Sequence, residues 1–167
     1  MKNEFNLLIL HNLLDYDSSR YISAEMQFKN SLPCWINQAG SAELRTLMLK
    51  YLNMVQQHIF KIKKESDAGK LSAISLTNGL MRTYIEEADE KLIYCQGTEK
   101  DACLLACLQH INRYKISKYA VAATFANALE VEEVVDLFLE MEADEKIFYD
   151  QLLQLTKYQI NMMSVAW

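Results

Sequence analysis

Three amphipathic stretches of the sequence each place a charged or amide side chain where a buried apolar residue is expected. Glu25 lies in the first stretch, Asn112 and Lys115 lie in another, and Glu145 lies in the last. Burial of such a side chain without a partner is costly, so we expect these side chains to contact one another. Glutamates gathered at the centre of a helix bundle can hold two metal ions, whereas two carboxylates and one lysine can form a buried ion pair.

The residue count favours the ion pair. A dimetal carboxylate site needs about four carboxylates and usually two histidines in Glu-x-x-His pairs, and this sequence contains no Glu-x-x-His. His58 shares an apolar face with Tyr51, which is more typical of a packed core histidine than of a ligand. An ammonium at Lys115 would repel a metal cation. We therefore expect Lys115 to neutralise Glu25 and Glu145, with no metal or other cofactor at the bundle centre.

A relocated iron or manganese site is the alternative that the residues leave open. It could use Glu25, His58 and Glu145, or it could be a mononuclear site near Glu86 and Glu87. The last two residues belong to an acidic run, which is more typical of a solvated helix face. The sequence contains no phosphate-binding glycine loop and no plausible Ser-His-Asp or Cys-His grouping, so it favours a protein that is not an enzyme.

The composition predicts an acidic helical protein. Hydrophobic residues make up 51% of the 167 residues, and four glycines and one proline are too few for the turns of a sheet protein. The 17 Lys and Arg residues against 22 Asp and Glu give a net charge of -5, which disfavours nucleic acids and membrane surfaces as partners. We expect one helical domain over residues 1–167.

Apolar side chains at intervals of three and four residues predict five helices. The stretch before Gly40 is either one long helix or two, since Asp17-Ser18-Ser19 could cap a restart, and Gly40 is expected to end it in a left-handed conformation. The other predicted elements are a helix capped by Ser41, a loop over residues 65–69, a helix from about Leu71 to Cys95, a helix with Thr98 and Asp101 as a capping box, a helix from about Val131, and a packed or frayed tail from Tyr158 to Trp167.

Several short motifs follow one another along the chain: Ser23-Ala24-Glu25-Met26-Gln27, Leu32-Pro33, Asp101-Ala102-Cys103-Leu104-Leu105-Ala106, Tyr114-Lys115-Ile116-Ser117-Lys118-Tyr119, Glu145-Lys146 and Gln159-Ile160-Asn161. In order and spacing they resemble the YciE and YciF type of ferritin-like proteins, a bacterial family associated with stress responses. The resemblance covers about Leu13 to Asn161. It implies an all-α fold, a ferritin-like antiparallel four-helix bundle with one additional helix between the second and third bundle helices.

The resemblance also implies which positions correspond to the family's metal site. Two glutamates of the family are kept here, and the other positions are neutral or basic, as though a ferritin-like scaffold had lost its dimetal centre. This implies a non-enzymatic, stress-related structural or protein-interaction role, and the alternative is a metal-binding oxidoreductase or iron-handling protein. We expect the amides among these positions to hydrogen-bond the carboxylates. The matching positions are Glu25, Asn53, Gln56, Asn112, Lys115 and Glu145.

The remaining expectations concern partners and location. Phe5, Leu8, Ile9 and Trp35 lie off the main apolar stripes, which predicts more apolar surface than a small bundle buries and therefore a homodimer, with another protein as a further partner. No secretory signal and no membrane span are predicted. The four cysteines form no CxxC pair, so we expect free thiols and a cytoplasmic protein.

Overall fold

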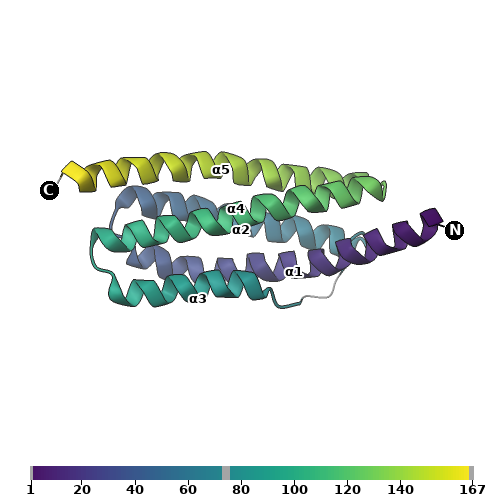
Figure 1. Cartoon of the computed structure of the whole chain (residues 1–167), viewed down its shortest axis with the longest axis horizontal. Coiled ribbons are helices and arrows are strands. Elements are labelled where there is room, and N and C mark those ends of the chain that lie inside the picture. The colour runs from purple at the N-terminus through teal and green to yellow at the C-terminus, as the bar shows by residue number, and fades with distance from the viewer. Residues whose placement is uncertain (1, 73–75, 166–167) are drawn as a thin grey trace.

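The computed structural model describes residues 2–72 and 76–165, which form five helices (Figure 1). Within these ranges there is no strand, and no helix is long and apolar enough to cross a membrane. The predicted all-α fold is confirmed. The helices are α1 (Lys2–Gln38), α2 (Ala42–Asp67), α3 (Gly79–Tyr94), α4 (Thr98–Ala128) and α5 (Glu132–Val165).

Helices α1, α2, α4 and α5 form an antiparallel four-helix bundle. The α1–α2 hairpin lies against the α4–α5 hairpin, so that α1 contacts α4 and α2 contacts α5. Helix α3 lies outside the bundle, against α1 and α4, and returns the chain to the end where α2 begins (Figure 1). The predicted architecture, with one additional helix between the second and third bundle helices, is confirmed.

The first helix is continuous, which resolves the choice between one helix and two. The hydroxyl groups of Ser18 and Ser19 donate to the carbonyls of Asp15 and Tyr16, at 3.2 and 2.8 Å. These serines therefore bond to the preceding turn and do not cap a new helix. Pro33 lies inside α1, and the helix continues past it to Gln38.

The backbone conformation and the side-chain contacts of the connection between α1 and α2 differ from those predicted. Gly40 is not among the described residues with positive φ, so it is not a left-handed cap. The Asp101 carboxylate, predicted to cap α4, instead accepts hydrogen bonds from the backbone N–H groups of Gly40 and Ser41, at 2.7 and 2.8 Å. Ser41 caps α2 as predicted, because its hydroxyl accepts from the N–H of Leu44 at 3.1 Å. The side chain of Asp101 thus fastens the α1–α2 connection to the start of α4.

Helix α3 begins at Gly79, so the prediction that it starts near Leu71 is wrong. Asn78 caps the helix, because its side-chain oxygen accepts from the N–H of Met81 at 2.9 Å. Residues 76–78 are not helical, and residues 73–75 of the predicted helix lie outside the described part of the chain. Leu71 and Leu76 fit a helical period in the sequence, but neither lies in a helix.

The last helix is longer than its sequence pattern indicates. Helix α5 continues to Val165, so the predicted tail from Tyr158 onward is helical as far as it is described, and residues 166–167 lie beyond that. Tyr158, Ile160 and Met162 are all exposed. Because these apolar residues do not face the core, the stretch has no buried stripe that would have revealed a helix.

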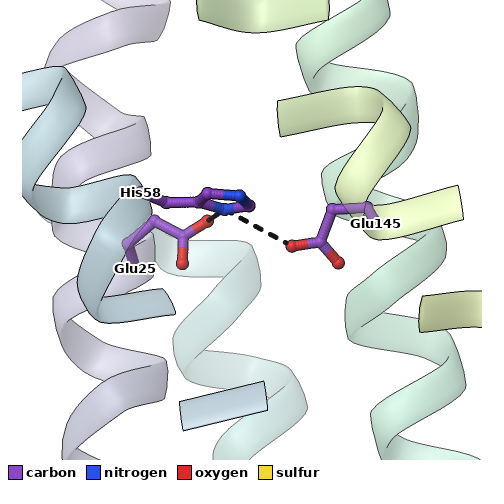
Figure 2. A group of neighbouring side chains, drawn as sticks. All are labelled: Glu25, His58 and Glu145. Atoms are coloured by element: carbon purple, nitrogen blue, oxygen red, sulfur yellow. Dashed lines mark ion pairs between the residues drawn. The ribbon is translucent and has the colours of Figure 1, made fainter. Parts of the chain in front are cut away.

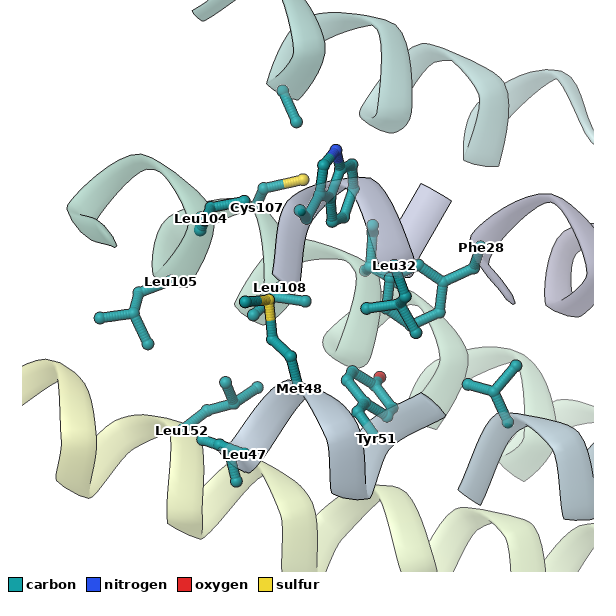
Figure 3. Close-up of a cluster of buried hydrophobic side chains, with 14 of the residues drawn as sticks. Phe28, Leu32, Leu47, Met48, Tyr51, Leu104, Leu105, Cys107, Leu108 and Leu152 are labelled. Carbon is teal, nitrogen blue, oxygen red and sulfur yellow. The ribbon is translucent and has the colours of Figure 1, made fainter. Parts of the chain in front are cut away.

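Apolar side chains fill two clusters along the bundle. One surrounds Phe28 and Tyr51, near the end where α2 and α4 begin (Figure 3), and the other surrounds Tyr119 and Phe138. Trp35, predicted to lie off the main stripes, is fully buried, and its indole N–H donates to Asp89 on α3 at 2.7 Å. Along their helices, the predicted polar residues Glu25, Asn112, Lys115 and Glu145 lie between the two clusters.

Candidate functional site

A buried polar cluster lies at the bundle centre, with contributions from all four bundle helices. Glu25 comes from α1, His58 from α2, Lys115 from α4 and Glu145 from α5, and each is at most 2% exposed. Figure 2 shows the Glu25 and Glu145 carboxylates pointing toward the His58 ring from neighbouring helices. The helix faces that carry these residues are otherwise apolar, so the cluster must satisfy its own charges.

Lys115 is the cation that joins the two carboxylates. Its Nζ lies 3.0 Å from Glu25 Oε1 and also contacts Glu145 Oε1. The ammonium lies over two aromatic rings as well, 4.8 Å from the centroid of Tyr51 and 5.5 Å from that of Phe28. Two carboxylates and two ring faces therefore surround this ammonium in place of water. The predicted ion pair is present.

Three neutral groups donate hydrogen bonds to the carboxylates. The Tyr119 hydroxyl donates to Glu25, and the Tyr51 hydroxyl donates to Glu145 Oε2 at 2.6 Å. The Asn112 amide donates to the same oxygen of Glu145 at 2.6 Å and to its backbone carbonyl at 2.9 Å. Burial and the adjacent glutamate raise the pKa of each tyrosine well above its usual value, so both hydroxyls stay protonated as donors.

His58 connects the cluster to the surface of the bundle. Its Nε2 lies 3.1 Å from Oδ2 of Asp144, whose side chain is 36% exposed. Its Nδ1 faces inward, 3.8 Å from Glu25 Oε1 and 3.7 Å from Glu145 Oε1. The fully buried imidazole is thus the link between the partly exposed Asp144 and the enclosed carboxylates.

The two buried carboxyls differ in how readily they ionise. Burial by itself raises the pKa of Glu25, but Lys115 and His58 outweigh burial and lower that pKa to about 2. Burial raises the pKa of Glu145, and the nearby Glu25 charge acts in the same direction, against the attraction of Lys115. Burial alone lowers the pKa of Lys115, yet the two glutamates raise it above its usual value. Lys115 is therefore the cation of the cluster, and Glu25 is the carboxyl that is held more firmly in its charged form.

The residues present do not fit the dimetal centre of a ferritin-like bundle. Within the described ranges, the histidine and carboxylate side chains gathered closely enough to share an ion are Glu25, His58 and Glu145, with ligand atoms within 4.8 Å of one another. Two metal ions need about four carboxylates and two histidines. The charged Lys115 ammonium already binds the Oε1 atoms of both glutamates, which are the oxygens that a metal ion would use.

The structure brings together four of the six predicted positions. Asn53 and Gln56 are exposed on α2, so the expectation that their amides contact the carboxylates is wrong. Tyr51 and His58 take the inward positions of this helix. The positions that meet are Glu25, Asn112, Lys115 and Glu145.

The tyrosine hydroxyls are the part of the cluster that the sequence analysis missed. Tyr51 and Tyr119 both lie on predicted inward stripes, and Tyr119 follows Lys115 by one helical turn. That spacing is the signal that could have identified Tyr119 as a partner of the cluster. Glu86 and Glu87 are exposed on α3, as expected for a solvated face.

Comparisons with known proteins agree with this fold. A sequence model of the family described as "Domain of unknown function (DUF892)" matches residues 12–164, whereas no curated protein matches significantly. The crystal structure of the E. coli stress protein YciF is similar, with a TM-score of 0.87, 23% identity, and coverage of 91% of this chain and 97% of that chain.

A second solved structure is that of YcfI from Rhodopseudomonas palustris, for which a structural role has been suggested. It has a TM-score of 0.82 and 23% identity, and the match covers 86% of this chain and 92% of that chain. At such identities, these two structures establish a common fold. The predicted resemblance to YciF-type proteins is confirmed, and because the family model matches nearly the whole sequence, the chain belongs to the DUF892 family.

Proposed function

We propose that this protein is a metal-free member of its family with a structural or protein-interaction role, and that it is not an enzyme. The observation that carries the proposal is the ammonium of Lys115, which contacts both Glu25 and Glu145. A divalent cation at the same oxygens would have to displace a group that the two glutamates keep charged. A stress-related role is the part of the proposal that rests on the similarity to YciF, which is described as a stress protein.

Metal analysis tests this proposal directly. The chain is purified without chelator, its iron, manganese and zinc are measured, and it is then titrated with Mn²⁺ and, without oxygen, with Fe²⁺. We expect far less than one equivalent of metal and no saturable binding. The Lys115→Glu, Asn112→Glu variant should gain Mn²⁺ binding, because it adds two carboxylates beside Glu25 and Glu145. Stoichiometric metal in the unchanged protein would contradict the proposal.

A mononuclear iron or manganese site is the second candidate function. The observation that favours it is the cluster of Glu25, His58 and Glu145, whose ligand atoms lie within 4.8 Å of one another. Such a site needs Lys115 to leave the carboxylates or lose its proton. The same titration separates the candidates, since this one predicts saturable binding of one ion per chain that is lost in Glu25→Gln.

We further propose that the chain forms a homodimer through the first turns of α1. Figure 1 shows the start of α1 extending past the end of the bundle, and Leu14 is the first buried residue in the described part of this helix. Phe5 is 65% exposed and Leu8 is 58% exposed. A short helical segment that buries little apolar surface is marginally stable in water, so packing against the same segment of a second copy would stabilise it.

A cytoplasmic location belongs to the same proposal. The described cysteines are free thiols, which is the state that a reducing compartment maintains. Treatment of intact cells with a membrane-impermeant thiol reagent, compared with lysed cells, tests this location. Labelling of Cys34, the exposed cysteine, only after lysis is the expected result.

A further inference from the structure

Two cysteines meet where the chain passes from α3 to α4. Cys95 is the residue that follows α3, and Cys103 lies in the first turns of α4. Their Sγ atoms are 3.0 Å apart, about 1 Å longer than the ~2.05 Å of a disulfide bond. Both residues are half-buried, so the two sulfurs are in contact with each other and within reach of small solutes.

The other two cysteines are placed differently. Cys107 is buried one turn beyond Cys103, and its thiol donates to the carbonyl of Tyr84 at 3.6 Å. Burial raises the pKa of Cys107 to about 12, so this thiol is inert near neutral pH. Cys34 is exposed and belongs to α1. Among the described thiols, Cys95 and Cys103 are therefore the pair arranged for a reaction with each other.

A groove gives access to Cys103, one member of this pair. It has a volume of about 320 Å³ between α3 and α4, and its lining includes Lys91, Cys103, Cys107 and His110. A small neutral oxidant such as a hydroperoxide fits this space easily. Burial and the neighbouring Cys95 raise the pKa of Cys103 to about 11, so its thiolate is scarce at neutral pH and the reaction is slow.

We propose that Cys95 and Cys103 form a reversible disulfide on sustained exposure to hydroperoxide, and that this bond fastens the end of α3 to α4. The contact of the two sulfurs and their position on opposite sides of the α3–α4 connection carry this inference. It is independent of the proposed metal-free role, because the pair lies on α3 and α4 and shares no residue with the central cluster.

The chemistry balances with hydrogen peroxide as the oxidant. The thiolate of one cysteine attacks a peroxide oxygen, the O–O bond breaks, and that sulfur becomes a sulfenic acid while water is released. The sulfur of the second cysteine then attacks the sulfenic sulfur, the S–S bond forms, and the S–O bond breaks with release of a second water. The two thiols together lose two electrons and two protons, and a dithiol reductant reverses the change.

The bond would act mainly on α3. This helix is held by its contacts with α1 and α4, and its C-terminal end reaches α4 through a short connection containing Gly97, whose φ is positive. A disulfide across these eight positions restricts the unfolded chain and prevents the end of α3 from separating from the bundle. We expect oxidation to raise the Tm by on the order of 5 °C.

The experiment uses the full chain with Cys34→Ser, which removes the exposed thiol that could link two chains. After treatment with hydrogen peroxide, peptide mapping should identify a Cys95–Cys103 link that dithiothreitol removes, with a mass two hydrogen atoms below that of the two thiol peptides together. Hydrogen exchange in the last turn of α3 should slow several-fold on oxidation. Cys95→Ser and Cys103→Ser should each abolish the mass change, whereas Cys107→Ala should retain it.

Three results would overturn the inference. One is a chain that keeps all its thiols after prolonged exposure to peroxide, and another is a disulfide that involves Cys107. The third is accumulation of sulfinic acid on Cys103 without a link to Cys95. Peptide mapping of the Cys34→Ser protein distinguishes these results, so the test does not depend on whether the other variants fold.

Discussion

At the scale of single residues, Lys115 supplies the positive charge between the two buried carboxylates at the bundle centre. One ammonium contacts both glutamates, and the hydroxyls of Tyr51 and Tyr119 and the amide of Asn112 donate further hydrogen bonds to the carboxylates. The arrangement works because a lysine needs no further ligands, whereas a metal ion needs several in fixed geometry. A buried ion pair of this kind is stable only while both the ammonium and its carboxylate partners are present.

Replacing Lys115 by Met should destabilise the protein strongly. The change leaves Glu25 and Glu145 without their cation in a buried site, which costs about 3–5 kcal/mol by comparison with other broken buried pairs. Urea unfolding at pH 7 measures the loss. Lys63→Met on the exposed face of α2 is the matched control, and it should change the free energy of unfolding by less than about 0.5 kcal/mol. Equal effects of the two substitutions would contradict the central ion pair.

Replacing each buried glutamate by Gln should have unequal effects at pH 7. Glu25→Gln removes the carboxylate that is strongly held in its charged form and should cost on the order of 2 kcal/mol more than Glu145→Gln. Gln imitates a protonated carboxylic acid, and the pKa of Glu145 is already raised toward that form. A larger loss for Glu145→Gln, measured by urea unfolding, would contradict the opposite pKa shifts of the two carboxyls.

The lowered pKa of Glu25 predicts that the free energy of unfolding decreases at acidic pH. The folded-state pKa of about 2 lies below the usual value of 4.5, so ionised Glu25 stabilises the fold above about pH 4.5. This contribution is lost as the pH falls from there toward 2. The free energy of unfolding of the unchanged protein should decrease over this window, and its advantage over Glu25→Gln should shrink in parallel. A constant advantage over the whole window would contradict this origin.

At the scale of elements, the ends of the helices are held by side chains from distant parts of the chain. Asp101 at the start of α4 binds the two backbone N–H groups of Gly40 and Ser41, and Trp35 on α1 binds Asp89 on α3. Each contact joins two elements that meet only in the tertiary structure. These contacts, together with the apolar clusters, set the position of each helix along the bundle axis. The central residues of the four bundle helices therefore lie in the same layer.

Replacing Asp101 by Ala should loosen the joint between the α1–α2 connection and α4. Two backbone N–H groups lose a charged acceptor, which costs about 1.5–3 kcal/mol for hydrogen bonds to an ionised group. Urea unfolding measures the loss, and hydrogen exchange at Gly40 and Ser41 should speed up in the same variant. Glu99→Ala, an exposed acid two residues earlier, is the control and should have a small effect.

At the scale of the whole molecule, the extended start of α1 distinguishes this chain from a closed bundle. Four bundle helices already bury the two apolar clusters, so the exposed side chains before Leu14 are not needed to complete the described core. An apolar segment of this kind is typical of an association surface. A second copy of the same chain offers a matching segment, which is the simplest partner by symmetry.

Replacing Phe5 and Leu8 together by Glu should convert the dimer into a monomer of 19.4 kDa. Charges on this surface make apolar contact between two copies unfavourable, while the bundle itself remains folded because neither residue is buried. Light scattering at tens of micromolar measures the mass. Ile93→Glu, at a 76% exposed position of α3, should leave the dimer intact. A monomeric unchanged protein would contradict the proposed interface.

The amino-acid sequence is sufficient to predict the fold class and the charged residues Glu25, Lys115 and Glu145 of the central cluster. The period of apolar residues and the scarcity of glycine and proline require long helices, because local geometry alone sets the spacing of a buried stripe. Glu25, Lys115 and Glu145 could be identified because each is a charge on such a stripe, and a buried charge must find a partner. These inferences depend on neighbouring residues of the same helix, which the sequence displays directly.

Tertiary packing determines which polar side chains complete the cluster and where the helices end. Asn53 and Gln56 point to solvent because the rotation of α2 about its axis is set by the packing of Tyr51 and neighbouring apolar residues. Asp101 binds Gly40 and Ser41 across 61 and 60 positions of the chain, and Cys95 contacts Cys103 across a turn that the sequence left open. Such contacts join segments whose relative position is fixed only when the helices pack, so no local pattern records them.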